Sequence, residues 1–232
     1  MAGRGDLQEA HKIDTTHIYT LRMGRWQKMF RPINPDRWFS GVSLAESFAE
    51  GYAKRHNVDV GLICCADGGT SLQQWMPGEA LFEHAVCQAK LACRTSQIAG
   101  VLWHQGEADS HAPNYDTYQQ RFEIMMQALR KELGLQDVPF LLGGLGDFLE
   151  LYPIPGYIHV NAALQNIARD NEMTEFVSAE GLTAKPDNLH FNSASLYEFG
   201  LRYLDVFESM EKAAIADKTI KEDLQRTEME LL

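Results

Sequence analysis

The chain has 232 residues, of which 45% are hydrophobic, and a formal net charge of −11 at pH 7. One domain with a sizeable buried core fits this length, and no long polar linker divides the sequence. The negative charge disfavours binding to nucleic acids and to anionic membrane surfaces, since both repel an acidic protein. We therefore expect small or neutral partners.

Features of a membrane-bound or exported protein are not expected from this sequence. It contains no run of about 18 apolar residues, and charged side chains occupy the first 15 residues, where a signal peptide would need an apolar stretch. The four cysteines, Cys64, Cys65, Cys87 and Cys93, lack zinc-type spacing and are expected to be buried free thiols in apolar surroundings. This use of cysteine predicts a reducing, cytoplasmic location.

Short apolar runs alternate with amphipathic stretches along the chain, which predicts an α/β fold with a parallel sheet covered by helices on both faces. The buried strands are expected over residues 17–21, 58–64, 99–103, 138–143 and 175–178. The helices are expected over residues 43–55, 80–94, 118–133, 158–169 and 193–210. Ser43 and Glu46 predict a capping box for the first helix, and Gly134 should end the third.

The last 20 residues differ from the rest because they are dense in charge and carry only a narrow apolar stripe. We expect a domain over residues 1–212, followed by a charged amphipathic helix over residues 213–232. This helix would pack on its own domain or form a contact in a homo-oligomer. The apolar stripe consists of Ala213, Ala216, Ile220, Leu224 and Leu231.

Open parallel sheets bind ligands beyond the carboxyl ends of their strands, so the loops that follow the predicted strands are the places to look for a site. The first such loop contains Gly68-Gly69-Thr70-Ser71. Paired glycines allow backbone N–H groups to approach a ligand closely and to act as oxyanion donors. A tight turn without function is the alternative interpretation of this pair.

The second loop is Trp103-His104-Gln105-Gly106-Glu107. The amide of Gln105 can donate a hydrogen bond to a developing oxyanion. Trp103 is either a core residue or a wall on which a sugar stacks, and His104 is either a hydrogen-bonded structural residue or a proton-transfer group. A metal site is a further alternative, for which the candidate ligands are His104, Glu107, Asp109 and His111.

The third loop contains Asp187-Asn188-Leu189-His190. Asp187 and His190 are three residues apart, which in a turn brings their side chains together. The carboxylate can then accept a hydrogen bond from the imidazole Nδ1–H, and Nε2 is left to take a proton from a hydroxyl nucleophile. The alternative is a lone surface histidine. Together, the three loops predict an ester hydrolase that acts on a small polar substrate.

The Gly-Gly-Thr-Ser turn, the Trp-His-Gln-Gly-Glu-Ala-Asp loop and the Asp-Asn-Leu-His-Phe loop resemble the sialate O-acetylesterase and acetylxylan esterase-like branch of the SGNH hydrolases. The resemblance spans nearly the whole chain. It implies a three-layer α/β/α flavodoxin-like fold with a mostly parallel sheet. It also implies hydrolysis of acetyl esters on carbohydrates without a metal or an organic cofactor.

The resemblance further implies a role for each loop. His190 would be the general base and Asp187 its orienting acid, while Glu107 competes for the acid role because some members assign it to the corresponding glutamate. Donors at Gly68, Gly69 and Gln105 would line the oxyanion hole. The residues expected to contact the substrate are Trp103, His104 and Thr70.

One part of the family pattern is not found in these 232 residues. The nucleophilic serine of the family lies in Gly-Gln-Ser-Asn-Met-Ala-Gly, at the end of the first strand, and this chain begins with Met1-Ala2-Gly3. We therefore expect the serine two residues upstream of Met1 and the first strand, normally central in the sheet, before it. The chain without them is expected to be inactive and to expose two rows of backbone groups.

Two serines within the chain are weaker candidates for the nucleophile. Ser43 fits a helix cap better than a nucleophile elbow, and Ser71 shares the loop expected to supply an oxyanion donor. The leading functional hypothesis is thus a carbohydrate O-acetylesterase. A non-catalytic carbohydrate-binding pseudo-esterase is the alternative, and a metallohydrolase ranks third.

Overall fold

The strands of the protein form two three-stranded groups. In the first group, β1 (Ile18–Arg22) lies between β2 (Arg25–Lys28), which is antiparallel to it, and β3 (Val60–Leu62), which is parallel. These features come from a computed structural model that describes residues 2–230, with only the course of the backbone described beyond residue 213. Strand β2 was not predicted, because its Arg-Trp-Gln-Lys sequence is polar and mostly exposed.

In the second group, β5 (Phe140–Gly143) lies between β4 (Val101–Trp103) and β6 (Thr174–Val177) and is parallel to both. All four residues of β5 are buried, as expected for a strand with helices on both faces. The predicted α/β fold with a mostly parallel sheet is confirmed. Strands β3 and β4 are not paired with each other, so the sheet is split between them.

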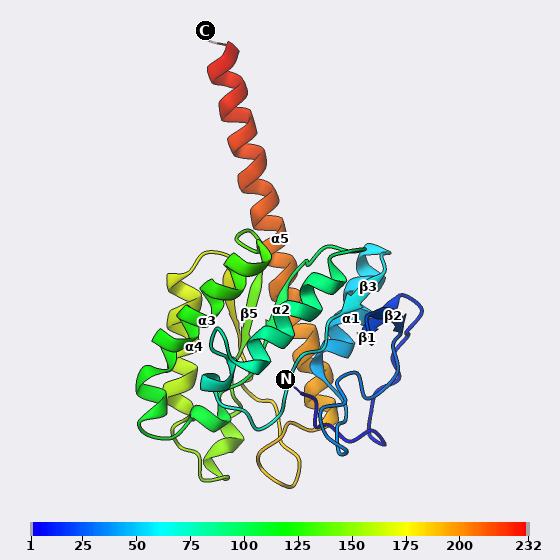
Figure 1. Cartoon of the computed structure of the whole chain (residues 1–232), viewed down its shortest axis with the longest axis vertical. Coiled ribbons are helices and arrows are strands. Elements are labelled where there is room, and N and C mark those ends of the chain that lie inside the picture. The colour runs from blue at the N-terminus through cyan, green and yellow to red at the C-terminus, as the bar shows by residue number, and fades with distance from the viewer. Residues whose placement is uncertain (1, 231–232) are drawn as a thin grey trace.

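Five helices cover the strands in two layers, which gives the expected α/β/α arrangement (Figure 1). Helices α1 and α5 pack against each other on one face, and α3 packs against both α2 and α4 on the other. Their bounds are α1 (Leu44–His56), α2 (Ala80–Ala92), α3 (Tyr118–Leu133), α4 (Tyr157–Asp170) and α5 (Ser193–Glu230). Short 3₁₀ helices in the described chain are η1 (Leu72–Trp75), η2 (Glu107–Asp109), η3 (Asn114–Thr117) and η4 (Asp147–Glu150).

The predicted helix ends are confirmed where local chemistry fixes them. The Ser43 hydroxyl caps α1, while the Glu46 carboxylate accepts the backbone N–H of Ser43 at 3.0 Å, so the capping box is complete. Gly134 ends α3 in the left-handed conformation with φ of 67°. Helix α5 continues past residue 210 to Glu230 without a break, so the proposed division at residue 213 still rests on sequence pattern alone.

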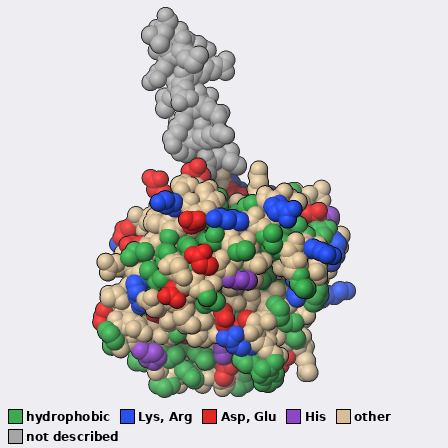
Figure 2. All heavy atoms as spheres, viewed as in Figure 1, with side chains coloured by type: hydrophobic (Ala, Val, Ile, Leu, Met, Phe, Trp, Pro, Cys, Tyr) green, Lys and Arg blue, Asp and Glu red, His purple; other side chains and the backbone are tan. Residues whose placement is uncertain are grey.

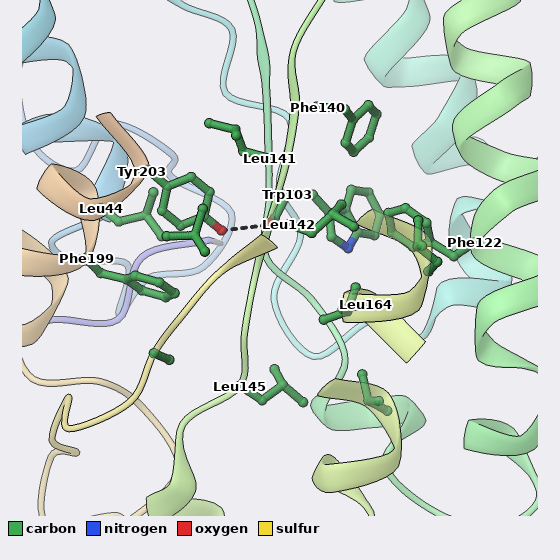
Figure 3. Packing of buried hydrophobic residues seen from close by; sticks show 14 of the residues in the cluster. Leu44, Trp103, Phe122, Phe140, Leu141, Leu142, Leu145, Leu164, Phe199 and Tyr203 are labelled. Carbon is green, nitrogen blue, oxygen red and sulfur yellow. Dashed lines mark hydrogen bonds between the residues drawn. The ribbon is translucent and has the colours of Figure 1, made fainter. Parts of the chain in front are cut away.

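The core joins the two helical layers through the strands, as Figure 3 shows. Tyr203 of α5 donates a hydrogen bond from its hydroxyl to the carbonyl oxygen of Trp103 at 2.6 Å, while Phe122 of α3 packs against the other side of Trp103. Leu141 and Leu142 of β5 are fully buried between these layers. Burial of a side chain of this size contributes about 1.5–3 kcal/mol to stability.

The surface corrects one sequence prediction. Cys87 and Cys93 are exposed, on the outer side of α2 and just after it, whereas Cys64 and Cys65 are partly buried. Cys87 and Cys93 have apolar neighbours in the sequence, but those neighbours face the core while the two thiols face solvent. The prediction that these two cysteines are buried is therefore wrong. On the face shown in Figure 2, acidic and basic side chains are interspersed. No helix in the described part of the chain is long and apolar enough to cross a membrane.

Candidate active site

The loop before α5 brings Asp187 and His190 together as predicted. The Nδ1 atom of His190 lies 2.9 Å from one carboxylate oxygen of Asp187. The other carboxylate oxygen accepts the backbone N–H groups of Leu189 and His190, both at 2.9 Å. Partial burial opposes ionisation, but these hydrogen bonds outweigh it and lower the pKa of Asp187. The ionised carboxylate thus holds the imidazole with Nδ1–H toward it and leaves Nε2 available.

His190 faces a cavity of about 750 Å³ that also reaches the first two candidate loops. Its side chain is 35% exposed. Gly68, Gly69, Gln105 and Glu107 line the same cavity. The fold therefore brings together the three loops that sequence spacing had placed at separate strand ends.

The glycine pair offers one free donor. The Gly68 N–H already donates to a carboxylate oxygen of Asp36 at 2.9 Å. Gly69 has φ of 78°, a conformation suited to glycine, and a side chain there would meet no atom within 4 Å. No acceptor for the Gly69 N–H occurs among the described backbone and side-chain groups. Of the two glycines, Gly69 is thus the one that can donate to a ligand.

The amide of Gln105 is fully engaged in this structure. Its Nε2 donates to the carbonyl oxygen of Thr70 at 3.0 Å and to the Asp109 carboxylate at 2.7 Å, and its Oε1 accepts from the Tyr118 hydroxyl at 3.1 Å. One of these bonds ties the second loop to the first, and the other joins Gln105 to Asp109 within the second loop. Gln105 would have to release one of these bonds in order to donate to an oxyanion.

The three residues expected to contact the substrate lie at the cavity but are largely buried. Burial lowers the pKa of His104 to about 4, and its Nε2 lies 3.2 Å from the carbonyl oxygen of Gly144. His104 is therefore neutral at pH 7, which favours the structural interpretation. Trp103 packs edge-on against aromatic rings on both sides, and the Thr70 hydroxyl accepts the indole N–H of Trp75 at 3.0 Å.

Among the described residues, the carboxylate that contacts His190 belongs to Asp187. Glu107 lines the cavity but forms no hydrogen bond or ion pair with His190. This geometry favours Asp187 over Glu107 as the residue that orients the base.

The serine and threonine hydroxyl groups of the described cavity lining are engaged in local structure. Ser43 caps α1, Thr70 donates to the carbonyl oxygen of Asp67, and Ser96 donates to that of Ala92. The hydroxyl of Ser71 pairs with the Gln74 side chain at the start of η1 instead of facing His190. None of these hydroxyls is hydrogen-bonded to His190.

A buried ion pair beside the site was not foreseen from the sequence. Arg4 and Asp36 form a two-point contact, at 3.0 and 2.6 Å, and Lys185 donates to the carbonyl oxygen of Arg4 at 3.0 Å. Burial opposes ionisation of Asp36, but hydrogen bonds from Arg4, Gly68 and Ser40 lower its pKa to about 2. Asp36 thus connects the N-terminal segment with the glycine loop. Arg4 and Gly68 each lie 32 residues from Asp36 in the sequence, so no local motif could have found these two contacts.

The proposed metal ligands do not converge. Within the described residues, no group of three or more histidine, cysteine, aspartate or glutamate side chains is placed to hold a metal ion. Asp109 is fully buried, where it accepts the Leu72 backbone N–H at 2.7 Å and pairs with Arg121 at 3.1 Å. Asp109 therefore holds loops together, and the metallohydrolase hypothesis loses its ligand set.

The α/β/α fold and the Asp187–His190 pair beside the cavity give the arrangement that the sequence predicts for a hydrolase. The chain belongs to the family described as carbohydrate esterase, sialic acid-specific acetylesterase, whose model matches residues 1–209. This family membership confirms the resemblance inferred from the three loops.

Individual relatives agree with the family. The chain is 28% identical over 194 residues to a probable carbohydrate esterase of Arabidopsis thaliana, covering 80% of this chain and 72% of the relative. A crystal structure from Arabidopsis thaliana has a TM-score of 0.79 at 26% identity, with 90% of this chain and 93% of that chain covered.

Two more distant structures share the fold. NanS has a TM-score of 0.71 at 18% identity, with 91% and 93% of the two chains covered. A carbohydrate acetylesterase from Xanthomonas citri has a TM-score of 0.60 at 15% identity, with 81% of this chain and 47% of that chain covered.

Proposed function

We propose that this site removes O-acetyl groups from carbohydrates of the sialate or acetylxylan type by a serine mechanism in which His190 is the general base. The observation that carries the proposal is the Asp187–His190 pair, because it leaves Nε2 open toward the cavity. The sugar class is inferred from the family and from the names of the relatives.

The nucleophile in this proposal is a serine two residues upstream of Met1, in a Gly-Gln-Ser-Asn sequence. Ala2, Gly3 and Arg4 line the same cavity as His190, which supports a nucleophile from this end of the chain. The occupied hydroxyls of Ser43 and Thr70 also favour a nucleophile from outside the described residues.

In the first half-reaction, the serine oxygen attacks the acetyl carbonyl carbon while Nε2 of His190 takes the hydroxyl proton. The Gly69 N–H would donate to the resulting oxyanion. Collapse of this intermediate breaks the ester bond, and His190 returns the proton to the sugar oxygen. In the second half-reaction, water attacks the acetyl-enzyme with His190 as base, which releases acetate and restores the serine.

The test compares the 232-residue chain with a form extended by an apolar strand ending in Gly-Gln-Ser-Asn. We expect the extended form to release acetate from an aryl acetate and from an acetylated sugar, and the 232-residue chain to show no release. His190→Ala in the extended form should lower kcat by roughly 10³-fold or more, because the serine loses its base. Undiminished turnover in that variant contradicts the proposed role of His190.

A non-catalytic carbohydrate-binding role is the second candidate, favoured by the absence of a hydroxyl paired with His190 among the described residues. It predicts that the extended form binds an acetylated sugar without releasing acetate. The cytoplasmic location and a homo-oligomeric state are further proposals that rest on cysteine use and on the tail pattern.

A further inference from the structure

A nearly fully exposed tryptophan lies in the turn that follows Asp36. Trp38 is 95% exposed, and its neighbour Phe39 is 50% exposed. The two rings meet edge to face, with their centroids 5.2 Å apart. An apolar side chain of this size stabilises a fold only through the area that it buries, so packing does not account for a tryptophan at this position.

The turn itself is held in place by hydrogen bonds. The Ser40 N–H donates to the carbonyl oxygen of Arg37 at 3.1 Å, which closes a turn with Trp38 and Phe39 at its two central positions. The Ser40 hydroxyl accepts the Arg37 N–H at 3.0 Å and donates to the Asp36 carboxylate at 2.8 Å. The backbone that carries the two rings is thus ordered before a ligand binds, which reduces the entropic cost of binding.

This turn lies at the rim of the cavity that contains His190. Arg37 and Phe39, the residues on either side of Trp38, both line that cavity. The guanidinium of Arg37 also donates to the carbonyl oxygen of Gly68 at 3.2 Å, so the turn is attached to the glycine loop. Phe39 and Trp38 therefore form an aromatic ledge that leads from the cavity wall to the outside of the protein.

The charges around the ledge favour an uncharged ligand. The arginines of the described cavity lining, Arg4 and Arg37, are paired with Asp36 and Asp67, each at 2.6 Å. An anionic sugar would have to compete with these carboxylates for a cation, in a protein with a formal net charge of −11. A sugar without a charge meets no such competition.

We propose that the aromatic ledge of Phe39 and Trp38 is a subsite for an uncharged pyranose ring of an oligosaccharide, outside the cavity that receives the acetyl group. One face of such a ring presents C–H groups, which pack on the apolar, partly negative face of an indole ring. Arg37 and Asp67, both partly exposed beside the ledge, offer donors and acceptors for the hydroxyl groups of the ring.

The ring on the ledge is a different ring from the acetylated one. The acetyl group must enter the cavity to reach His190, whereas Trp38 projects into solvent beyond the cavity lining. The ledge therefore selects chains of sugar units over single sugars. The position of the acetyl group rests on the proposed function, but stacking of a sugar ring on Trp38 does not require hydrolysis, so the two ideas can fail separately.

The experiment measures sugar binding to the 232-residue chain, since binding needs no nucleophile. The probes are an O-acetylated xylotetraose, an O-acetylated xylose and an O-acetylated sialic acid. Calorimetric titration gives each Kd, and tryptophan emission reports whether an exposed indole becomes covered. The variants are Trp38→Ala and Trp38→Phe, and Met23→Ala is the matched control, because Met23 is 96% exposed between β1 and β2.

We expect the tetraose to bind about tenfold more tightly than either single sugar and to shift the emission to shorter wavelength. Trp38→Ala should abolish this shift and weaken tetraose binding by about tenfold, because the stacking surface is lost, while binding of the acetylated xylose changes by less than about twofold. Trp38→Phe should retain most of the affinity, since an aromatic face remains, and Met23→Ala should retain all of it. The melting temperature of Trp38→Ala should equal that of the parent chain, because the exposed ring contributes little packing.

The absence of tetraose binding, or equal affinity of the parent and Trp38→Ala for the tetraose, overturns the proposal. Tighter binding of the acetylated sialic acid than of the tetraose also overturns it. Self-association that depends on Trp38, without sugar binding, does the same, because a second copy would then cover the ledge.

Two outcomes separate the subsite from the proposed function. Binding of the tetraose that depends on Trp38, without acetate release by the extended form, supports the subsite and counts against the proposed function. Acetate release from the tetraose by the extended form, with a KM that Trp38→Ala leaves unchanged, overturns the subsite and leaves the proposed function intact.

Discussion

At the scale of single residues, the site depends on which hydrogen bonds are already made. Asp187 uses one carboxylate oxygen for the backbone of its own loop and the other for His190, so the imidazole has one fixed orientation. Gly68 and Gln105 donate to other parts of the protein, while Gly69 keeps a free N–H. The geometry thus assigns different tasks to neighbouring residues of one motif.

The acid that orients His190 can be identified by comparing two variants in the extended, active form. Asp187→Asn should lower kcat/KM by roughly 10²- to 10⁴-fold, because the amide can no longer stabilise the imidazolium or fix the tautomer. Glu107→Gln should lower it by less than about tenfold, since Glu107 forms no hydrogen bond or ion pair with His190 in the described chain. A larger effect for Glu107→Gln, measured by steady-state kinetics, would transfer the role to Glu107.

The Asp36 carboxylate should stabilise the fold in a pH-dependent way. Its pKa falls from the ordinary 3.8 to about 2 in the folded protein, so the ionised form stabilises the fold above pH 4, and this contribution is lost as the pH falls through 2. We expect Asp36→Asn to lower the free energy of unfolding by about 2 kcal/mol at pH 7, with the difference shrinking toward pH 2.

Urea unfolding at several pH values measures this effect. Asp67→Asn is a matched control, because Asp67 pairs with Arg37 at the surface and should contribute less than about 1 kcal/mol. Equal losses for the two variants, or a difference independent of pH, would contradict the assigned role of Asp36.

At the scale of secondary-structure elements, helices α1 and α5 hold the two strand groups together. Helix α1 packs on β1 and β3, α5 packs on β5 and β6, and the two helices contact each other closely. Gly200 of α5 allows this approach, because a Cβ atom there would lie 2.0 Å from the Ser47 hydroxyl and 2.1 Å from the carbonyl oxygen of Leu44. The junction between the halves is therefore a helix pair without room for another methyl group.

Gly200→Ala should destabilise the protein by about 1–3 kcal/mol, because backbone atoms of α1 must move, and this cost exceeds the gain in helix propensity. Gly51→Ala on α1 is the matched control. A Cβ atom there would lie 2.4 Å from the end of the Leu204 side chain, which can rotate away. Thermal and denaturant unfolding should show that the Gly200→Ala variant is clearly less stable than the Gly51→Ala variant. The reverse order would contradict the close contact of α1 and α5 at Gly200.

At the scale of the whole molecule, the sheet is divided while the core remains shared. Phe122, Trp103 and Tyr203 link both helical layers through β4, whereas the space between β3 and β4 contains no strand of the described chain. The cavity that separates the halves also contains the candidate site.

The sequence by itself determined the local features of this protein. Apolar runs located β1, β3, β4, β5 and β6, and capping residues located the ends of α1 and α3. The Asp187–His190 pair was also predictable, since three residues in one turn suffice to join a carboxylate and an imidazole. These features depend on contacts within a few residues of the chain, and local patterns encode such contacts directly.

Only the tertiary structure decided which candidates have free hydrogen-bonding groups. Gly68 contacts Asp36, and Gln105 contacts Thr70, across more than 30 residues of sequence. His104 is neutralised by burial in a place where its partner, Gly144, is also more than 30 residues away. The polar sequence of β2 and the exposure of Cys87 likewise follow from neighbours in space. Side chains meet such neighbours only after the chain has folded, so no local pattern records which groups remain free to bind a substrate.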